Sequence, residues 1–145
     1  MRSKLGLFNE EAEDESLIKG LLQLMQQQQA DYTNTFRCLT LNEYDMKLFS
    51  MPDFQHWNDQ WQARLSRQPN QKDEIKALMK SHNPAVIPRN HHVEEALDAA
   101  EKGDLDVMNK LLDALKNPYG YTPEQDEYAK LSVSASCCYQ TFCGT

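Results

Sequence analysis

The sequence has 145 residues, of which 40% are hydrophobic and 26% are charged, with a formal net charge of −7. This size and composition predict one small domain with a hydrophobic core. The negative charge disfavours nucleic acid and an anionic membrane surface as partners, because both require a basic protein face. No apolar run approaches the roughly 20 residues that cross a bilayer, and no secretory signal is present. We therefore expect a cytoplasmic protein.

Apolar residues recur at helical spacing between Leu17 and Met25 and predict a first helix. Asp31 is a suitable N-cap for a second helix, which carries Tyr32, Phe36 and Leu39 on its buried face. An acidic cluster precedes the first helix and consists of Glu10, Glu11, Glu13, Asp14 and Glu15. Carboxylates in a first helical turn complement the helix dipole, and we favour this interpretation over an acidic metal or partner site.

An aromatic stripe follows, in which Phe54, Trp57 and Trp61 fall on one side of a helix capped by Asp53. Aromatic side chains carry the largest area to bury. Core packing, or docking against another domain, is therefore favoured over a ligand-binding role for this stripe. A shorter helix is predicted to end near His82, before an extended, proline-framed link over residues 83–88.

Asn90 is the expected cap of a helix that holds Val93, and Gly103 is free to take the positive φ that ends it. Asp104 is the expected cap of the next helix, whose apolar side includes Leu111. A short Gly-Asp connection between two helices predicts an antiparallel helical hairpin.

No clear periodicity follows residue 118. The predicted fold is therefore all-α, an irregular multi-helix bundle with an extended C-terminal tail. We assign residues 1–118 to a helical domain and residues 119–145 to an irregular tail that carries Cys143.

The sequence contains no GxGxxG or Walker loop, no Gly-x-Ser-x-Gly elbow, and no HExxH or CxxC motif. His91 and His92 are adjacent and point about 100° apart on a helix. This geometry disfavours a shared metal ion, and capping or surface hydrogen bonding is favoured for the pair. Arg89 and Asn90, beside them, are candidates to brace the turn at Asn83.

The cysteines provide the other candidate chemistry. Cys38 is expected to be a buried thiol. Cys137, Cys138 and Cys143 do not have the spacing of a four-ligand zinc site. Cys143 is left as a candidate redox thiol near the C-terminus. No catalytic, cofactor-binding or metal-binding residue is predicted in this chain.

Several segments carry a family resemblance through their shared order. They are Lys4-Leu5-Gly6-Leu7 with the helix over 21–25, Ala30-Asp31-Tyr32-Thr33 with Phe36-Arg37, the tryptophan helix with Arg64-Leu65, Met79 with Asn83-Pro84 and Pro88-Arg89-Asn90, Glu94-Glu95-Ala96 through Gly103-Asp104, Asn117-Pro118-Tyr119, and Cys143 as the third residue from the end. In this order they resemble the C-terminal region of the selenoprotein O (YdiU) family of protein adenylyltransferases.

The resemblance implies that this chain is the C-terminal helical part of a larger kinase-like protein, a pseudokinase that binds ATP with Mg or Mn and transfers AMP to Ser, Thr or Tyr of protein substrates. The phosphate-binding loop and the ATP- and metal-contacting residues of the family belong to the upstream core, and none maps onto this chain. The chain is thus expected to pack on that core, to lack the ATP site and to be inactive alone. Met1 is expected to mark either an artificial boundary or a reading frame that begins inside a longer gene, and truncation is favoured over an independently evolved module.

The resemblance also gives Cys143 a role. The family ends in a cysteine or selenocysteine followed by two small residues, here Gly144 and Thr145. In the family this position is associated with a redox link to a cysteine near the activation loop. The alternative to an enzyme segment is a stand-alone helical protein-interaction module. A small thiol or metal-binding protein built on the C-terminal cysteines is a third hypothesis.

Overall fold

The computed structural model describes residues 1–130. These residues form seven α-helices and two short 3-10 helices, with no strand among them, which confirms the all-α prediction. The elements are η1 (Arg2–Leu5), α1 (Asp14–Gln27), α2 (Tyr32–Leu41), η2 (Lys47–Ser50), α3 (Pro52–Ser66), α4 (Lys72–His82), α5 (Asn90–Glu101), α6 (Asp106–Leu115) and α7 (Pro123–Ala129). No helix in this part of the chain has the length and apolar character needed to cross a membrane.

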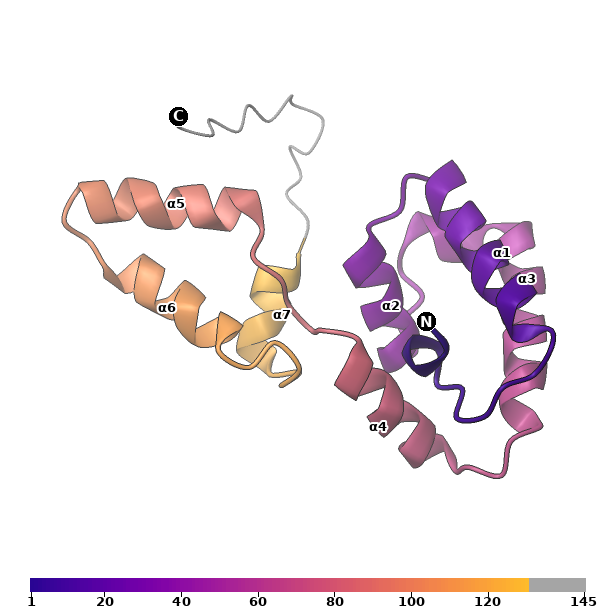
Figure 1. Ribbon diagram of the computed structural model, residues 1–145. Coiled ribbons are helices and arrows are strands. Elements are labelled where there is room, and N and C mark those ends of the chain that lie inside the picture. Colours follow the sequence, from indigo (N-terminus) through magenta and orange to yellow (C-terminus); the bar gives the residue numbers. More distant parts are fainter. Residues whose placement is uncertain (131–145) are drawn as a thin grey trace.

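The helices gather into two groups joined by an extended link (Figure 1). The first group holds η1, α1, α2, η2, α3 and α4, and the second holds α5, α6 and α7. The main hydrophobic core lies entirely in the first group and ends with Met79. The second group buries mainly small side chains, among them Ala96, Ala114 and Ala129.

The aromatic stripe of α3 forms the centre of the first group. Phe54, Trp57 and Trp61 are only 2%, 4% and 1% exposed. The indole N–H of Trp57 donates to the backbone carbonyl of Leu17 at 2.8 Å, and that of Trp61 donates to the carbonyl of Leu5 at 2.9 Å. The prediction of core packing is confirmed. The stripe is closed within this chain, so it is not an exposed docking face.

Helix starts test the predicted caps. The Asp31 side chain accepts a hydrogen bond from the backbone N–H of Asn34 at 2.7 Å, as expected of an N-cap. The prediction for Asp53 is wrong, because Pro52, with its fixed φ, already occupies the first turn of α3. The cap at Asn90 is also wrong by one residue, since Arg89 takes the extended conformation that precedes α5.

The predicted helical hairpin is confirmed by α5 and α6, which pack side by side (Figure 1). Gly103 ends α5 with a φ of +88°. The predicted cap at Asp104 is wrong by one residue, since Leu105 directly precedes α6. The Asp104 side chain still accepts from the backbone N–H of Asp106 at 2.9 Å, which satisfies one free donor at the start of α6.

The prediction of an irregular chain after residue 118 is wrong for Pro123–Ala129, which form α7. Thr122 caps this helix, and Thr122 and Gln125 form a reciprocal capping box. The Gln125 amide then donates to the backbone carbonyl of Ala114 at 2.8 Å and fixes α7 against α6. The division of the chain into folding units at residue 118 stays a prediction. Cys137, Cys138 and Cys143 lie outside the described residues.

Polar contacts connect the two groups. The backbone N–H of Ala85 donates to the carbonyl of Pro118 at 2.7 Å. The guanidinium of Arg89 forms a two-point ion pair with the cap residue Asp31. Arg37 on α2 pairs with Asp126 on α7. The expectation that Arg89 braces the turn at residue 83 is therefore wrong, since its partner lies at the start of α2.

Candidate functional site

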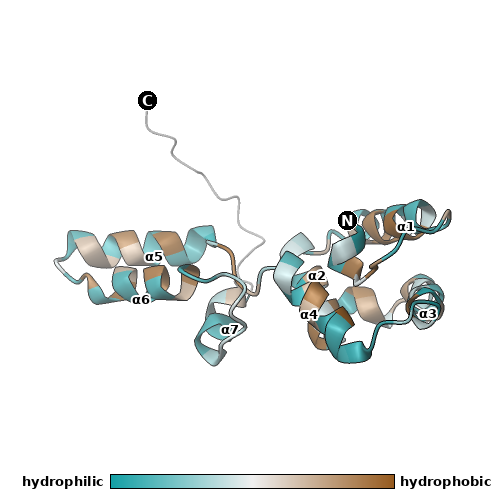
Figure 2. Ribbon diagram, turned by 60° about the horizontal axis from the view of Figure 1, so that its bottom comes forward, coloured by the Kyte–Doolittle hydropathy of each residue, from teal (hydrophilic) through white to brown (hydrophobic). Residues whose placement is uncertain are grey.

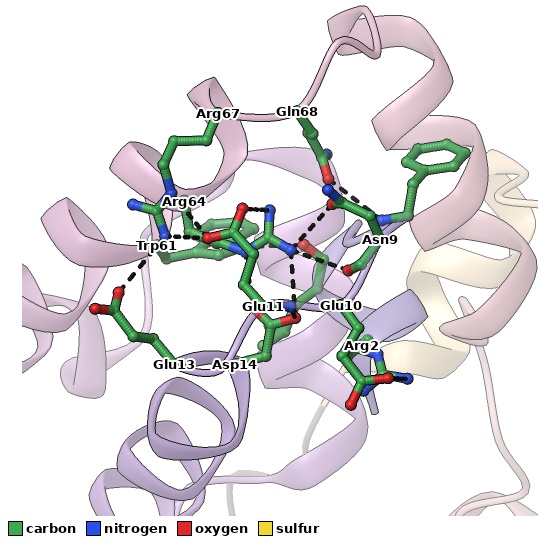
Figure 3. A network of polar contacts seen from close by, with 12 residues as sticks. Arg2, Asn9, Glu10, Glu11, Glu13, Asp14, Trp61, Arg64, Arg67 and Gln68 are labelled. Carbon is green, nitrogen blue, oxygen red and sulfur yellow. Dashed lines mark hydrogen bonds and ion pairs between the residues drawn. The ribbon is translucent and has the colours of Figure 1, made fainter.

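The densest group of charged side chains surrounds Arg64, in the last turn of α3 (Figure 3). The Arg64 side chain is 2% exposed, and its Nε donates to Oδ1 of Asp14 at 2.7 Å. Its Nη2 donates to the backbone carbonyl of Asn9 at 2.9 Å. Nη1 lies 3.1 Å from Oε1 of Glu11 in an ion pair. One buried cation thus holds the segment before α1 against α3.

Asp14 is the buried partner in this pair, with a side chain that is 3% exposed. Burial by itself would raise the pKa of Asp14. The hydrogen bond and the charge of Arg64, together with the backbone N–H of Glu11, outweigh that effect, so the pKa of this carboxyl is lowered. Asp14 is therefore ionised at neutral pH and is not poised to accept or release a proton.

A second, more exposed layer surrounds the buried pair. Arg67 donates to Oε2 of Glu11 at 2.6 Å from Nη2 and 2.9 Å from Nε. Gln68, which is buried, donates to the carbonyl of Gly6 at 2.8 Å and accepts from the backbone N–H of Phe8 at 3.2 Å. These contacts extend the polar network that holds the N-terminal segment against α3 (Figure 3).

Sequence reasoning missed this cluster. The sequence favours the helix dipole over a metal or partner site as the role of the acidic residues at the start of α1. In the structure Asp14 and Glu11 are partners of an arginine about 50 residues away along the chain. One pattern was available: Arg64 continues the 54–57–61 spacing of the buried aromatic side chains. A charged residue on a buried helix face requires a buried partner.

The cluster has the chemistry of a structural clamp. A cavity of about 380 Å³ lies beside it, lined by Asp14, Ser16, Gln60, Arg64 and Arg67 among others. The two arginines there are held by carboxylates, and Asp14 is held by Arg64. No residue in the lining pairs a nucleophile with a free base.

Asn83 forms a second polar centre, where η1, α2 and α4 meet. Its fully buried amide donates to the carbonyl of Lys4 at 2.8 Å and to the hydroxyl of Thr40 at 2.9 Å. The Asn83 backbone carbonyl accepts from the hydroxyl of Tyr121 at 2.7 Å, in the loop before α7. This residue therefore links the N-terminus, the end of α4 and the second group.

The histidine pair lies at the start of α5. The rings of His91 and His92 are 4.0 Å apart, and the His92 ring meets Tyr128 edge-on at 5.1 Å. Burial, followed by the charge of His92, lowers the pKa of His91. No group of three or more potential metal ligands is found among residues 1–130.

Cys38 is buried, as expected, on α2. Burial, assisted by the negative charge of Asp45, raises the pKa of its thiol to about 11. The thiol is therefore protonated and weakly reactive at neutral pH.

Comparisons with known proteins identify relatives along the whole chain. The family model described as "Protein adenylyltransferase SelO" matches residues 1–116. A protein nucleotidyltransferase YdiU of Brevibacillus brevis is 58% identical over 147 residues, and one of Clostridium beijerinckii is 55% identical over 146 residues. Both alignments cover 100% of this chain and 30% of the relative.

The YdiU relative of Halalkalibacterium halodurans is 55% identical over 147 residues, and this alignment also covers 100% of this chain and 30% of the relative. The chain thus spans about 30% of the length of the curated relatives it matches. Because the family model matches residues 1–116 of 145, this chain belongs to the SelO family of protein adenylyltransferases.

Proposed function

We propose that this chain is the helical C-terminal segment of a SelO-type protein adenylyltransferase, that it lacks the ATP site, and that it is inactive alone. The observation that supports this most is its match over its whole length to relatives of which it covers only 30%. The sequence has no phosphate-binding glycine motif. The buried charges around Arg64 are paired with one another, which leaves them no free part in catalysis.

In this proposal the remaining part of the polypeptide is a kinase-like core that binds ATP with Mg or Mn. The core transfers AMP to Ser, Thr or Tyr of cytoplasmic protein substrates. The present segment packs on that core and requires neither a nucleic acid nor a membrane partner.

A hybrid enzyme tests the proposal. The last 147 residues of the Brevibacillus brevis relative are exchanged for this chain, and a second hybrid exchanges the first 147 residues instead. We expect AMP transfer from radiolabelled ATP by the C-terminal hybrid, none by the N-terminal hybrid, and none by the isolated chain. If only the N-terminal hybrid transfers AMP, the proposed C-terminal place of this chain in the full-length protein is wrong. Stoichiometric ATP binding by the isolated chain in calorimetry would overturn the absence of a nucleotide site.

One observation favours the alternative function, a stand-alone helical interaction module. The first helical group closes its own core, including the α3 stripe that a docking segment would otherwise leave open. A module of this kind would be a cooperative monomer that does not restore activity in either hybrid.

We also propose that Cys143 forms a reversible disulfide with a cysteine of the core, on the basis of the family resemblance. Intact-mass analysis of the C-terminal hybrid, oxidised and reduced, with a Cys143→Ser control, tests this pairing. An oxidised protein without any crosslink to Cys143 would overturn it.

A further inference from the structure

The α5–α6 hairpin carries leucines that residues 1–130 leave uncovered. Leu97 and Leu112 are each 50% exposed, whereas their neighbours Ala96 and Leu111 are buried. Leu97 follows the buried Ala96 by one residue, and Leu112 follows the buried Leu111 by one residue. Each leucine is therefore rotated by about 100° about its helix axis, in the direction of the chain, from the line of contact between the two helices. Because α5 and α6 run antiparallel, the same rotational sense places both leucines on one side of the hairpin.

Other apolar residues complete this side. Each helix contributes residues at i, i+4 and i+7, which lie on one helix face. The resulting hairpin face consists of Val93, Leu97, Ala100, Met108, Leu112 and Leu115. Figure 2 shows hydrophobic stretches on both helices of the hairpin.

The rest of the described chain covers the opposite side. Gln125 of α7 donates a hydrogen bond to the carbonyl of Ala114 on α6. About the axis of α6, Ala114 is rotated by about 60° from Leu111, and Leu112 is rotated from Leu111 in the opposite direction. Lys110, on the same side of α6 as Ala114, and Asn117, just after the end of α6, line the cleft between α6 and α7. The hairpin face is therefore not the surface on which α7 packs.

The charge around the hairpin face indicates the kind of partner. Glu94 and Glu101 flank it on α5, both are exposed, and neither is paired with a cation in the described part of the chain. Lys116 flanks it at the end of α6, but its charge is paired with Asp113. The chain as a whole carries a net charge of −7, so a second copy would bring like charge to this surface. Residues 131–145 contain no Asp, Glu, Lys or Arg and cannot complement the two glutamates.

We propose that the hairpin face binds a basic amphipathic helix in the remaining part of the full-length protein. The inference rests on the proposed function, because it places the partner in the same polypeptide. An amphipathic helix lays apolar residues at i, i+3, i+4 and i+7 into such a surface, while its lysines meet Glu94 and Glu101. The chain covers only 30% of its relatives, so most of the polypeptide is available to supply this helix at high effective concentration.

The C-terminal hybrid described above provides the test. Photochemical carbene labelling of the Leu97 and Leu112 side chains is compared between the isolated chain and the hybrid. Carbodiimide coupling then joins carboxylates to nearby lysines, and mass spectrometry identifies the lysines joined to Glu94 and Glu101. We expect labelling of both leucines to be lost in the hybrid and both glutamates to couple to lysines of the core.

Substitutions supply an independent readout. Leu97→Gln with Leu112→Gln should change the melting temperature of the isolated chain little, because both side chains are half exposed there, and should lower that of the hybrid. Lys102→Glu, an exposed change facing the other side of α5, is the matched control and should leave both unchanged.

Three results would overturn the inference. Equal labelling of the leucines in a hybrid that transfers AMP would show that the hairpin face is free while the proposed function stands. Coupling of Glu94 and Glu101 only to a second copy would make the face a self-association surface. Labelling that rises when residues 131–145 are removed would make the tail the occupant. A hybrid without AMP transfer would instead count against the proposed function.

Discussion

Removing the buried cation of the Arg64 cluster should destabilise the protein strongly. In the variant Arg64→Met the side-chain volume is largely kept, but Asp14 stays buried with a 3% exposed side chain and without its counterion. Breaking a buried ion pair by removal of one partner costs about 3–5 kcal/mol, since the remaining charge is uncompensated. This is a large fraction of the roughly 5–15 kcal/mol that stabilises a typical domain.

Thermal and urea unfolding, followed by circular dichroism, measure this effect. With a shift of about 2–4 °C per kcal/mol for a chain of this size, the expected fall in Tm is roughly 6–20 °C. The double variant Arg64→Met with Asp14→Leu removes both charges and should recover most of the loss, because apolar replacement of a whole buried pair is often neutral or stabilising.

Arg67→Met is the matched control. Its guanidinium also pairs with Glu11, but its side chain is 44% exposed. Exposed ion pairs contribute about 0–1 kcal/mol, so the control should shift Tm by only a few degrees. Equal losses for Arg64→Met and Arg67→Met, or no recovery in the double variant, would refute the assignment of a buried clamp.

Three further outcomes follow from named residues. Burial would raise the pKa values of Asp14 and Asp31, but their arginine partners outweigh burial, so both pKa values are lowered in the folded state. The stability that these carboxylates contribute is therefore complete above their usual pKa of 3.8 and is lost as pH falls through the lowered values. Urea unfolding midpoints between about pH 6 and pH 2 measure this loss, and pH-independent midpoints would contradict it. Gly6→Ala places a Cβ 2.6 Å from Cγ2 of Ile75 at a φ of +74° and should lower the free energy of unfolding by roughly 1–3 kcal/mol. Gly103→Ala, at a φ of +88° with open space around it, should lower it by only the backbone strain of about 1 kcal/mol. Cys38 should resist iodoacetamide in the native protein at pH 8, where a pKa of about 11 leaves only ~0.1% thiolate, and should react after unfolding; peptide mapping that finds native Cys38 alkylated would contradict its burial.

Periodicity identified most of the helices because their signals are local. The stripes of α1 and α3 and the Gly103 stop between α5 and α6 each lie within a few turns of sequence. Helix α7 was missed because its seven residues are too few to show a period. Its actual signal was the capping box from Thr122 to Gln125, which is a short-range pattern of a different kind.

The candidate site could not be predicted in the same way. Asp14 and Arg64 meet only after α1 and α3 pack, and no spacing in the chain encodes a contact across 50 residues. Gly20 illustrates the same limit: it weakens a helix in isolation, yet a Cβ there would lie 3.3 Å from Cδ1 of Trp57, so a small residue suits the close approach of the two helices.

The placement of the tryptophans has a consequence for spectroscopy. Both tryptophans of the chain lie in α3, and their indoles report on the N-terminal segment through Leu5 and Leu17. The second helical group, α5 to α7, contains no tryptophan and is silent in indole fluorescence. Its helices still contribute to the far-ultraviolet ellipticity, so coincident fluorescence and ellipticity curves would indicate one cooperative unit. An ellipticity change that precedes the fluorescence change would mean that the hairpin melts while the tryptophan core is intact.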